Sequence, residues 1–131
     1  EKGVKLVLIN APTEYPYCYE QWYEQVQQFA DENDVDYINF IPLQNDIGLD
    51  MSQDTYDAGL HLNTTGAEKM ADYFGKYLVE NYNLTDYRND SEYASIWDKK
   101  EAAYDSMKQQ QYDELNKYGE LKSFGANAIQ N

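Results

Sequence analysis

Residues 4–41 read VKLVLINAPTEYPYCYEQWYEQVQQFADENDVDYINFI and decide the expected fold. Residues 4–9 form a short apolar run rich in β-branched side chains, which is typical of a parallel strand buried on both faces. Residues 35–41 predict a second strand. Between them, residues 19–32 predict an amphipathic helix with the apolar stripe Trp22, Val26, Phe29 and Ala30. A strand, a helix and a strand in this order predict a βαβ unit with parallel strands.

A long polar connection, residues 44–60, is expected after the second strand, because this stretch shows no regular periodicity. Loops of such length in compact domains are usually functional or disordered. In open α/β sheets, ligands gather beyond the carboxyl ends of the strands, and residues 10–17 follow the first strand in the same way. We therefore expect these two loops to meet at one rim of the sheet, beside His61.

Two further helices are expected. Thr65 and Glu68 form a capping box that opens the first helix, which ends at residues 81–83. Its expected apolar stripe consists of Ala67, Met70, Ala71, Phe74 and Leu78. The second helix, residues 91–118, has an apolar stripe too sparse for a coiled coil, so we expect it to pack on the α/β part as an appendage.

The sequence thus predicts an α/β fold: a partial flavodoxin-like parallel sheet (a βαβ unit plus a helix) with a C-terminal helical extension. The expected domains are residues 1–86 and 87–131. Two strands alone do not make a stable sheet with both faces covered, and their edges would be open for pairing. The chain also enters its first apolar run by Val4, so we interpret it as the downstream part of a longer polypeptide. The remaining strands are expected from a missing N-terminal half or from a second copy.

The composition narrows the classes of partner. The chain carries 24 acidic and 10 basic side chains, a formal charge of −14, which repels nucleic-acid phosphates and anionic lipid. No apolar run reaches about 18 residues, so no membrane insertion is expected. Cys18 is the only cysteine and His61 the only histidine, so neither an internal disulfide nor a zinc site is expected. No motif indicates a cofactor.

His61 lies just behind two carboxylates and just ahead of a helix start. Histidine is the residue type whose unperturbed pKa lies near neutral pH, so it is the usual hydrolytic general base when an acidic side chain orients it. Asp57 is the first candidate for this orienting role, and Asp54 is the alternative. Gly59 and Gly66 give the loop the backbone freedom that a tight turn needs. The competing interpretation is a loop histidine whose ring is satisfied by a backbone group.

Two blocks of sequence resemble a known family. Residues 54–78, DTYDAGLHLNTTGAEKMADYFGKYL, resemble the C-terminal catalytic block of SGNH/GDSL-type hydrolases, especially the surface-associated bacterial members. Residues 4–40 resemble the strand, loop, helix and strand that precede it. Two departures stand out. The family's aspartate lies three residues before the histidine, where this sequence has Ala58, whereas Asp57 lies four before. The family's Gly-Asp-Ser nucleophile block, and the Gly and Asn of its oxyanion hole, belong to an N-terminal half that this sequence lacks.

The resemblance implies an esterase or acyltransferase that acts on esters of carbohydrate or surface polymer, at the cell surface or outside the cell. His61 and Asp57 would supply two members of its Ser-His-Asp triad, and the chain would be inactive without the missing half. The expected cleft-wall residues are Asn10, Tyr15, Tyr17 and Trp22. The alternative is a non-catalytic module whose acidic surface, with 14 tyrosines in the chain, binds a protein or a glycan.

Overall fold

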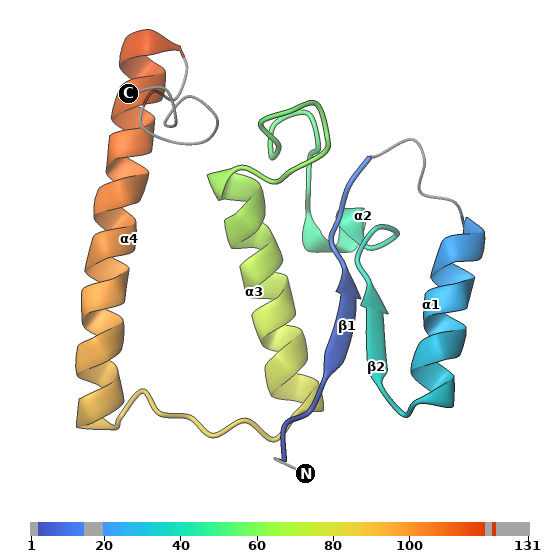
Figure 1. Cartoon of the computed structure of the whole chain (residues 1–131). Helices are drawn as coiled ribbons and strands as arrows, with labels where there is room; N and C mark the ends of the chain where they lie inside the picture. The colour runs from blue at the N-terminus through green and yellow to red at the C-terminus, as the bar shows by residue number, and fades with distance from the viewer. Residues whose placement is uncertain (1–2, 15–19, 120–121, 123–131) are drawn as a thin grey trace. The chain divides into compact units, whose positions relative to one another are not determined.

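The structure, a computed structural model, describes residues 3–14, 20–119 and 122. The chain divides into two compact units, Glu1–Tyr82 (unit 1) and Asn83–Asn131 (unit 2). Unit 1 contains β1 (Val7–Asn10), α1 (Glu20–Glu32), β2 (Asp36–Asn39), α2 (Gln44–Ile47) and α3 (Thr64–Asn81), and unit 2 contains α4 (Ser91–Tyr118) (Figure 1). The protein is therefore of the mixed α/β class, with a small parallel sheet and several helices.

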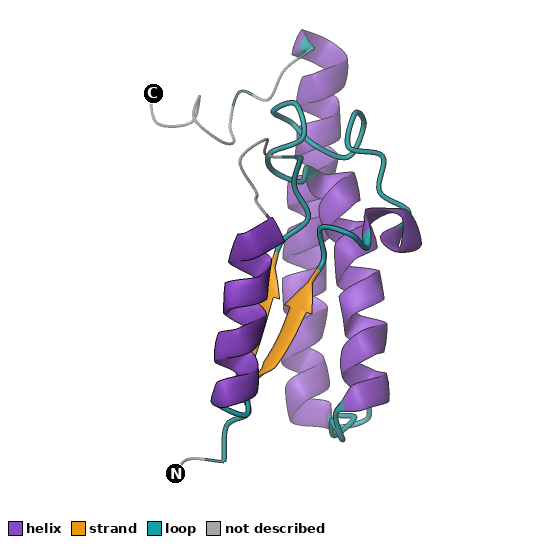
Figure 2. Cartoon of the chain, turned by 90° about the vertical axis from the view of Figure 1, so that its right-hand side faces the viewer, coloured by secondary structure: helices purple, strands orange, loops and turns teal. Residues whose placement is uncertain are grey.

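The sheet of unit 1 has the order β1-β2, with the strands parallel and Val7 opposite Asp36. Helices α1 and α3 lie on opposite sides of it, as the two views together show (Figures 1 and 2). This confirms the predicted order of strand, helix and strand and the parallel pairing. Both strands run toward the same end of unit 1, and the loop between α2 and α3 lies at that end (Figure 1).

The core of unit 1 is built around Phe40, which is fully buried and packs edge-to-face against Tyr73 and Phe74 of α3. Four more apolar side chains complete the buried cluster: Ile38, Ile47, Leu49 and Met51. Three of these four come from the stretch predicted to be a polar connection, and the same stretch contains α2. The prediction for residues 44–60 was therefore wrong in its first part, because every second residue from Ile47 to Met51 is apolar and closes over the sheet.

The predicted burial of the first strand on both faces was wrong for the part of the chain that the structure describes. Val4 is 83% exposed, Leu6 59% and Ile9 48%. The predicted stripe of α1 also holds only in part, because Ala30 is buried whereas Trp22 and Phe29 are about half exposed. The physical reason is the same in both cases, because few elements cover these side chains. Helix α1 packs on β2, and within residues 3–14, 20–119 and 122 the one strand beside β1 is β2.

The N-cap of helix α3 lies two residues before the one predicted from the capping box. Asn63 is the N-cap, and its side-chain oxygen accepts a hydrogen bond from the Gly66 N–H at 3.1 Å. The hydroxyl of Thr65 instead donates to Asn63 Oδ1 and to Asp54 Oδ1. The buried face also differs from prediction: Ala67 and Ala71 are exposed. The side chains packed on the core are Met70, Tyr73, Phe74 and Tyr77, which recur at i, i+3, i+4 and i+7 and therefore share one face of the helix.

A polar cluster ties the start of β2 to the end of α3. The Tyr82 hydroxyl donates to the Asp36 carboxylate, and Lys5 Nζ lies 2.9 Å from that carboxylate and 4.8 Å from the centre of the Tyr82 ring. The hydrogen bond to Asp36 raises the pKa of Tyr82 to about 12. The hydrogen bonds from Tyr82 and Lys5 lower the pKa of Asp36. The cluster therefore favours a neutral tyrosine beside an ionised aspartate.

This cluster predicts a loss of stability at alkaline pH. The folded protein keeps the Tyr82 proton up to about pH 12, whereas the unfolded chain releases it near the ordinary tyrosine pKa of 10. The stability that Tyr82 contributes is therefore fully present below pH 10 and is lost as the pH rises from 10 to about 12. In urea unfolding between about pH 9 and pH 12, the midpoint of the wild type should fall more steeply than that of Tyr82→Phe. Parallel curves for the two proteins would contradict this assignment.

Helix α4 of unit 2 has the predicted bounds. The Asp90 carboxylate caps its first turn by accepting from the N–H groups of Glu92 and Tyr93, and Gly119 ends it with φ 74°. None of its residues is buried, and Trp97 remains 62% exposed. The packing of this helix on the α/β part stays a prediction. Across the stretches that the structure describes, no helix combines the length and the apolar character needed to cross a membrane.

Candidate functional site

The only histidine lies on a hairpin-like loop, residues 54–63, which we term the His61 loop. Its two ends are joined by a hydrogen bond from the Asn63 N–H to the Asp54 carbonyl at 2.8 Å. Next along the loop, Thr55 and Leu62 form an antiparallel bridge. The Asn63 side chain adds hydrogen bonds to the carbonyls of Gln53 and Thr55. The loop is therefore a fixed structure at the carboxyl end of the parallel strands.

His61 and Asp57, which we term the dyad, meet within this loop. Asp57 Oδ2 lies 2.5 Å from His61 Nδ1, and Asp57 Oδ1 accepts the backbone N–H of His61 at 2.7 Å. Between them, Ala58 and Gly59 have φ values of 59° and 96°, so the backbone turns back on itself and closes the gap of four residues. The hydrogen bond from His61 lowers the pKa of Asp57. The sequence prediction that Asp57 lies beside His61 agrees with this geometry.

The dyad also defines which imidazole nitrogen carries the proton. An ionised carboxylate only accepts hydrogen bonds, so the contact requires the proton on His61 Nδ1. In the neutral ring, Nε2 then carries a free lone pair and can act as a base. The imidazole side chain is 67% exposed, and no hydrogen bond to Nε2 is formed by the residues that the structure describes. Its ring stacks on the ring of Tyr56, with centroids 5.8 Å apart and planes 12° from parallel.

The connection between β1 and α1 is joined to the His61 loop, as expected for two loops at one rim. The Glu14 N–H donates to the Gly59 carbonyl at 2.8 Å, and the Thr13 hydroxyl donates to the same oxygen at 3.2 Å. Beside this junction lies an open hollow of about 470 Å³, lined by Glu14 and by residues between Asp50 and Ala58. Tyr56 lines the hollow and contacts His61, so the hollow adjoins the dyad.

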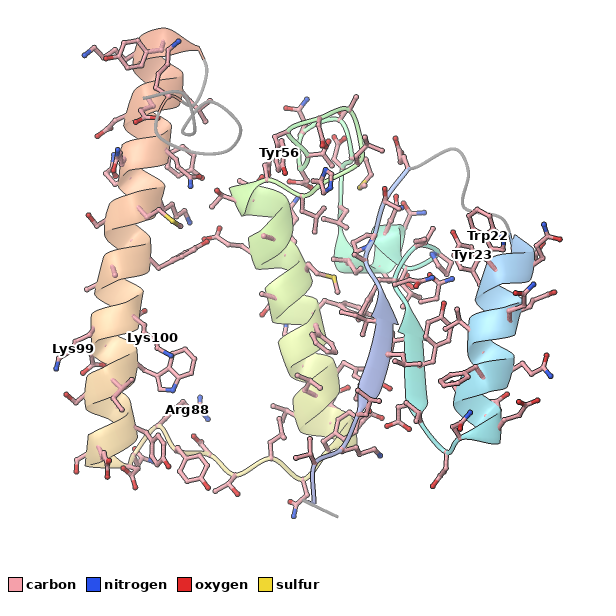
Figure 3. The ribbon with its side chains drawn as sticks, viewed as in Figure 1. Trp22, Tyr23, Tyr56, Arg88, Lys99 and Lys100 are labelled. Atoms are coloured by element: carbon pink, nitrogen blue, oxygen red, sulfur yellow. The ribbon has the colours of Figure 1, made fainter. Side chains whose placement is uncertain are left out.

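Sequence reasoning overlooked Glu14 and Tyr56. The signal for Glu14 was its place in the loop expected at the rim, and the signal for Tyr56 was its position between the two candidate carboxylates. Trp22 does not join the site: Figure 3 shows it on α1, well away from Tyr56. Asn10 contributes its backbone carbonyl, which accepts the Phe40 N–H, and its side chain does not line the hollow. Tyr15 and Tyr17 lie outside the residues that the structure describes.

Asp54, the alternative orienting carboxylate, has other partners. It is 2% exposed and accepts hydrogen bonds from the Asp50 N–H, the Thr65 hydroxyl and Lys69 Nζ, not from His61. Ser52, the nearest serine in sequence, donates its hydroxyl to Asp50 at 2.6 Å. Among residues 3–14, 20–119 and 122, no group of three or more His, Cys, Asp or Glu side chains is arranged to hold a metal ion.

No family model matches this chain, and neither a curated protein nor a solved structure does. The functional argument therefore depends on the geometry of the His61 loop.

Gly66 sets how closely the His61 loop approaches α3. A Cβ atom at Gly66 would overlap the Asp54 carbonyl oxygen and lie 3.0 Å from Asp54 Cβ. Gly66→Ala is expected to lower the free energy of unfolding by about 1–3 kcal/mol, because backbone must move to relieve the overlap. Gly75, on the same helix, has no atom within 4 Å of such a Cβ. Gly75→Ala should instead stabilise by about 0.5–1 kcal/mol, through better helix propensity. Urea unfolding checks both, and equal effects would contradict the close packing at Gly66.

Proposed function

We propose that this chain is the C-terminal part of an SGNH/GDSL-type ester hydrolase or acyltransferase, in which His61 and Asp57 belong to a Ser-His-Asp triad. The observation that supports this most is the 2.5 Å contact between Asp57 Oδ2 and His61 Nδ1, with the imidazole 67% exposed. A carboxylate that fixes one imidazole nitrogen leaves the other available as a general base. The sheet would then be part of a flavodoxin-like arrangement.

In the proposed reaction, His61 Nε2 takes the proton of a serine hydroxyl while the serine oxygen attacks the acyl carbonyl carbon. The same proton passes to the leaving alcohol oxygen as the ester bond breaks, and an acyl-serine remains. The oxygen of water, or of an acceptor hydroxyl in acyl transfer, then attacks the acyl carbonyl carbon while Nε2 takes its proton, and that proton passes to the serine oxygen as the acyl–serine bond breaks. Throughout, the Asp57 carboxylate holds the Nδ1 proton and stabilises the imidazolium that forms transiently.

The serine and the oxyanion hole are assigned to an N-terminal half of the protein. Within the described part of the chain no hydroxyl hydrogen-bonds His61 Nε2, and the Ser52 hydroxyl is bound to Asp50. The exposure of Val4 and Leu6, just before β1, and of Ile9 within it supports a sheet that continues in another segment or in a second copy. The proposed substrates are esters of carbohydrate or surface polymer, and the proposed location is the cell surface or the extracellular space.

The test is ester hydrolysis by the full-length protein, upstream residues included, with wild type and His61→Ala measured side by side. A short-chain p-nitrophenyl ester reports acyl-enzyme formation without knowledge of the natural acyl group. We expect turnover by the wild type and a loss of turnover in the variant. Equal rates in the two proteins would remove the catalytic assignment of His61.

A second candidate, a non-catalytic binding module, is favoured by the exposed aromatic side chains of α4. Trp97 is 62% exposed and Tyr118 is 50% exposed. With a formal charge of −14, such a surface suits a basic protein partner or a glycan. The upstream coding sequence separates the two candidates: a Gly-Asp-Ser block within about one domain length supports the enzyme, and its absence supports the module.

A further inference from the structure

The buried carboxylate of Asp54 is the strongest polar feature outside the dyad. Its side chain is 3% exposed and receives three donors: Lys69 Nζ at 2.6 Å, the Asp50 N–H at 2.8 Å and the Thr65 hydroxyl at 3.0 Å. Burial raises the pKa of Asp54, but the hydrogen bonds from these three donors outweigh it, so the pKa lies below its ordinary value. Asp54 is therefore an ionised group held inside unit 1, and Lys69 is its charged partner.

Asp54 also stands at the base of the His61 loop. Its carbonyl accepts the Asn63 N–H, and the Asn63 side-chain oxygen caps α3 through Gly66. The His61 loop begins at Asp54 and ends directly before α3. Because Lys69 lies in the second turn of α3, its ion pair with Asp54 joins the first residue of the loop to this helix. Both ends of the His61 loop are therefore fixed, Asp54 by its ion pair with Lys69 and Asn63 by its hydrogen bond from the Gly66 N–H.

We propose that Asp54 and Lys69 are positioning residues for the dyad, an inference that rests on the proposed function. Asp57 is three residues beyond Asp54, and His61 is two residues before Asn63. A shift between the two ends of the loop therefore changes the distance between Asp57 Oδ2 and His61 Nδ1. Displacements near 1 Å at a reacting group cost about 10²-fold in rate. Neither Asp54 nor Lys69 touches His61, so their effect is transmitted through the loop backbone.

The matched variants are Lys69→Met and Lys76→Met, which make the same change on the same helix. Lys69 pairs with the buried Asp54, whereas Lys76 pairs with Asp72, and both members of this second pair are 69% exposed. Loss of Lys69 leaves a buried carboxylate without its cation, and loss of Lys76 leaves an exposed one in water. Only Lys69→Met should therefore change the contact between Asp57 and His61.

The readout is the imidazole spectrum of His61 in ¹⁵N and ¹H NMR, which is unambiguous because the chain has one histidine. In the wild type and Lys76→Met, we expect a downfield proton on Nδ1 and the ¹⁵N shifts of the Nδ1–H form. In Lys69→Met, that proton signal should disappear and the ¹⁵N shifts should move toward a mixture of the two neutral forms. Lys69→Arg, which keeps the cation, should restore the wild-type spectrum. A folded Lys69→Met with an unchanged spectrum would overturn the proposal, and so would a failure of Lys69→Arg to restore it.

If Lys69→Met does not fold by circular dichroism, Thr65→Val replaces it, because it removes the hydroxyl that donates to Asp54 and to Asn63 and keeps the cation. A shifted His61 spectrum in Thr65→Val supports the positioning role, and an unchanged spectrum overturns it.

Kinetics on the full-length protein separate the two proposals: Lys69→Met should lower kcat by about tenfold or more with little change in KM. If the wild type hydrolyses no ester but the His61 spectrum responds to Lys69→Met, the proposed function fails and the positioning role stands. If hydrolysis depends on His61 and not on Lys69, the reverse holds.

Discussion

If His61 and Asp57 belong to the proposed triad, Asp57→Asn is expected to lower kcat/KM for ester hydrolysis by the full-length protein about 10⁴-fold, the effect of the same change in a Ser-His-Asp triad. The asparagine oxygen can still accept the backbone N–H of His61, which Asp57 Oδ1 now accepts at 2.7 Å. Its amide group, however, would donate to Nδ1, so the imidazole proton would move to Nε2. The ring would then have no lone pair where the serine proton is taken up. His61→Ala should lose at least as much activity, because it removes the base itself.

Asp72→Asn is the control for this change. Asp72 has the same chemistry, but it forms an exposed pair with Lys76 on α3 and does not contact His61. Its replacement should leave kcat/KM within about twofold of the wild-type value, because an exposed ion pair contributes little. An Asp57→Asn protein that retains activity close to the Asp72→Asn protein would show that the contact with Asp57 does not define the base.

Phe40→Ala is expected to lower the free energy of unfolding by about 3–5 kcal/mol, which is the usual cost of deleting a buried aromatic ring. Phe40 has no exposed surface, and its ring lies 5.5 Å from the ring of Phe74 and 6.3 Å from that of Tyr73. Its removal would leave a cavity between β2 and α3, and no neighbouring side chain can fill that space without leaving its own contacts. Urea unfolding followed by far-ultraviolet circular dichroism measures the change.

Phe29→Ala provides the matched comparison, because it deletes the same ring from a position that is 55% exposed. Its cost should stay near 0.5 kcal/mol, as for most surface substitutions. Similar losses in the two variants would mean that the sheet and α3 do not form the main core of unit 1.

The bounds of α4 and the parallel pairing of β1 with β2 could be predicted from the sequence. Helix α4 has its predicted bounds, because Asp90 supplies a cap directly before a long stretch of helix-forming residues. The parallel pair β1-β2 followed from two apolar runs that flank an amphipathic helix. The bounds of α4 depend on local sequence, and the parallel pairing follows from the short crossover connection through α1.

The predictions that failed depend on contacts between distant segments. Thr65 and Glu68 have the spacing of a capping box, yet Asn63 caps α3, because the buried Asp54 accepts a hydrogen bond from the Thr65 hydroxyl. The sequence favoured Asp57 over Asp54 as the partner of His61, but it did not indicate the partner of Asp54 itself. That partner is Lys69, which lies 15 residues away and meets Asp54 only in the folded chain.

The turn at Ala58 and Gly59 has a wider consequence for how an acidic side chain paired with an imidazole is recognised in a sequence. Two left-handed backbone positions absorb one additional residue, so an interval of four brings the acid and the imidazole within hydrogen-bonding distance. A pattern that demands an interval of three would pass over this pair, although Asp57 and His61 are in hydrogen-bonding contact. For groups carried on a tight loop, the handedness of the intervening backbone is a better guide than the number of intervening residues.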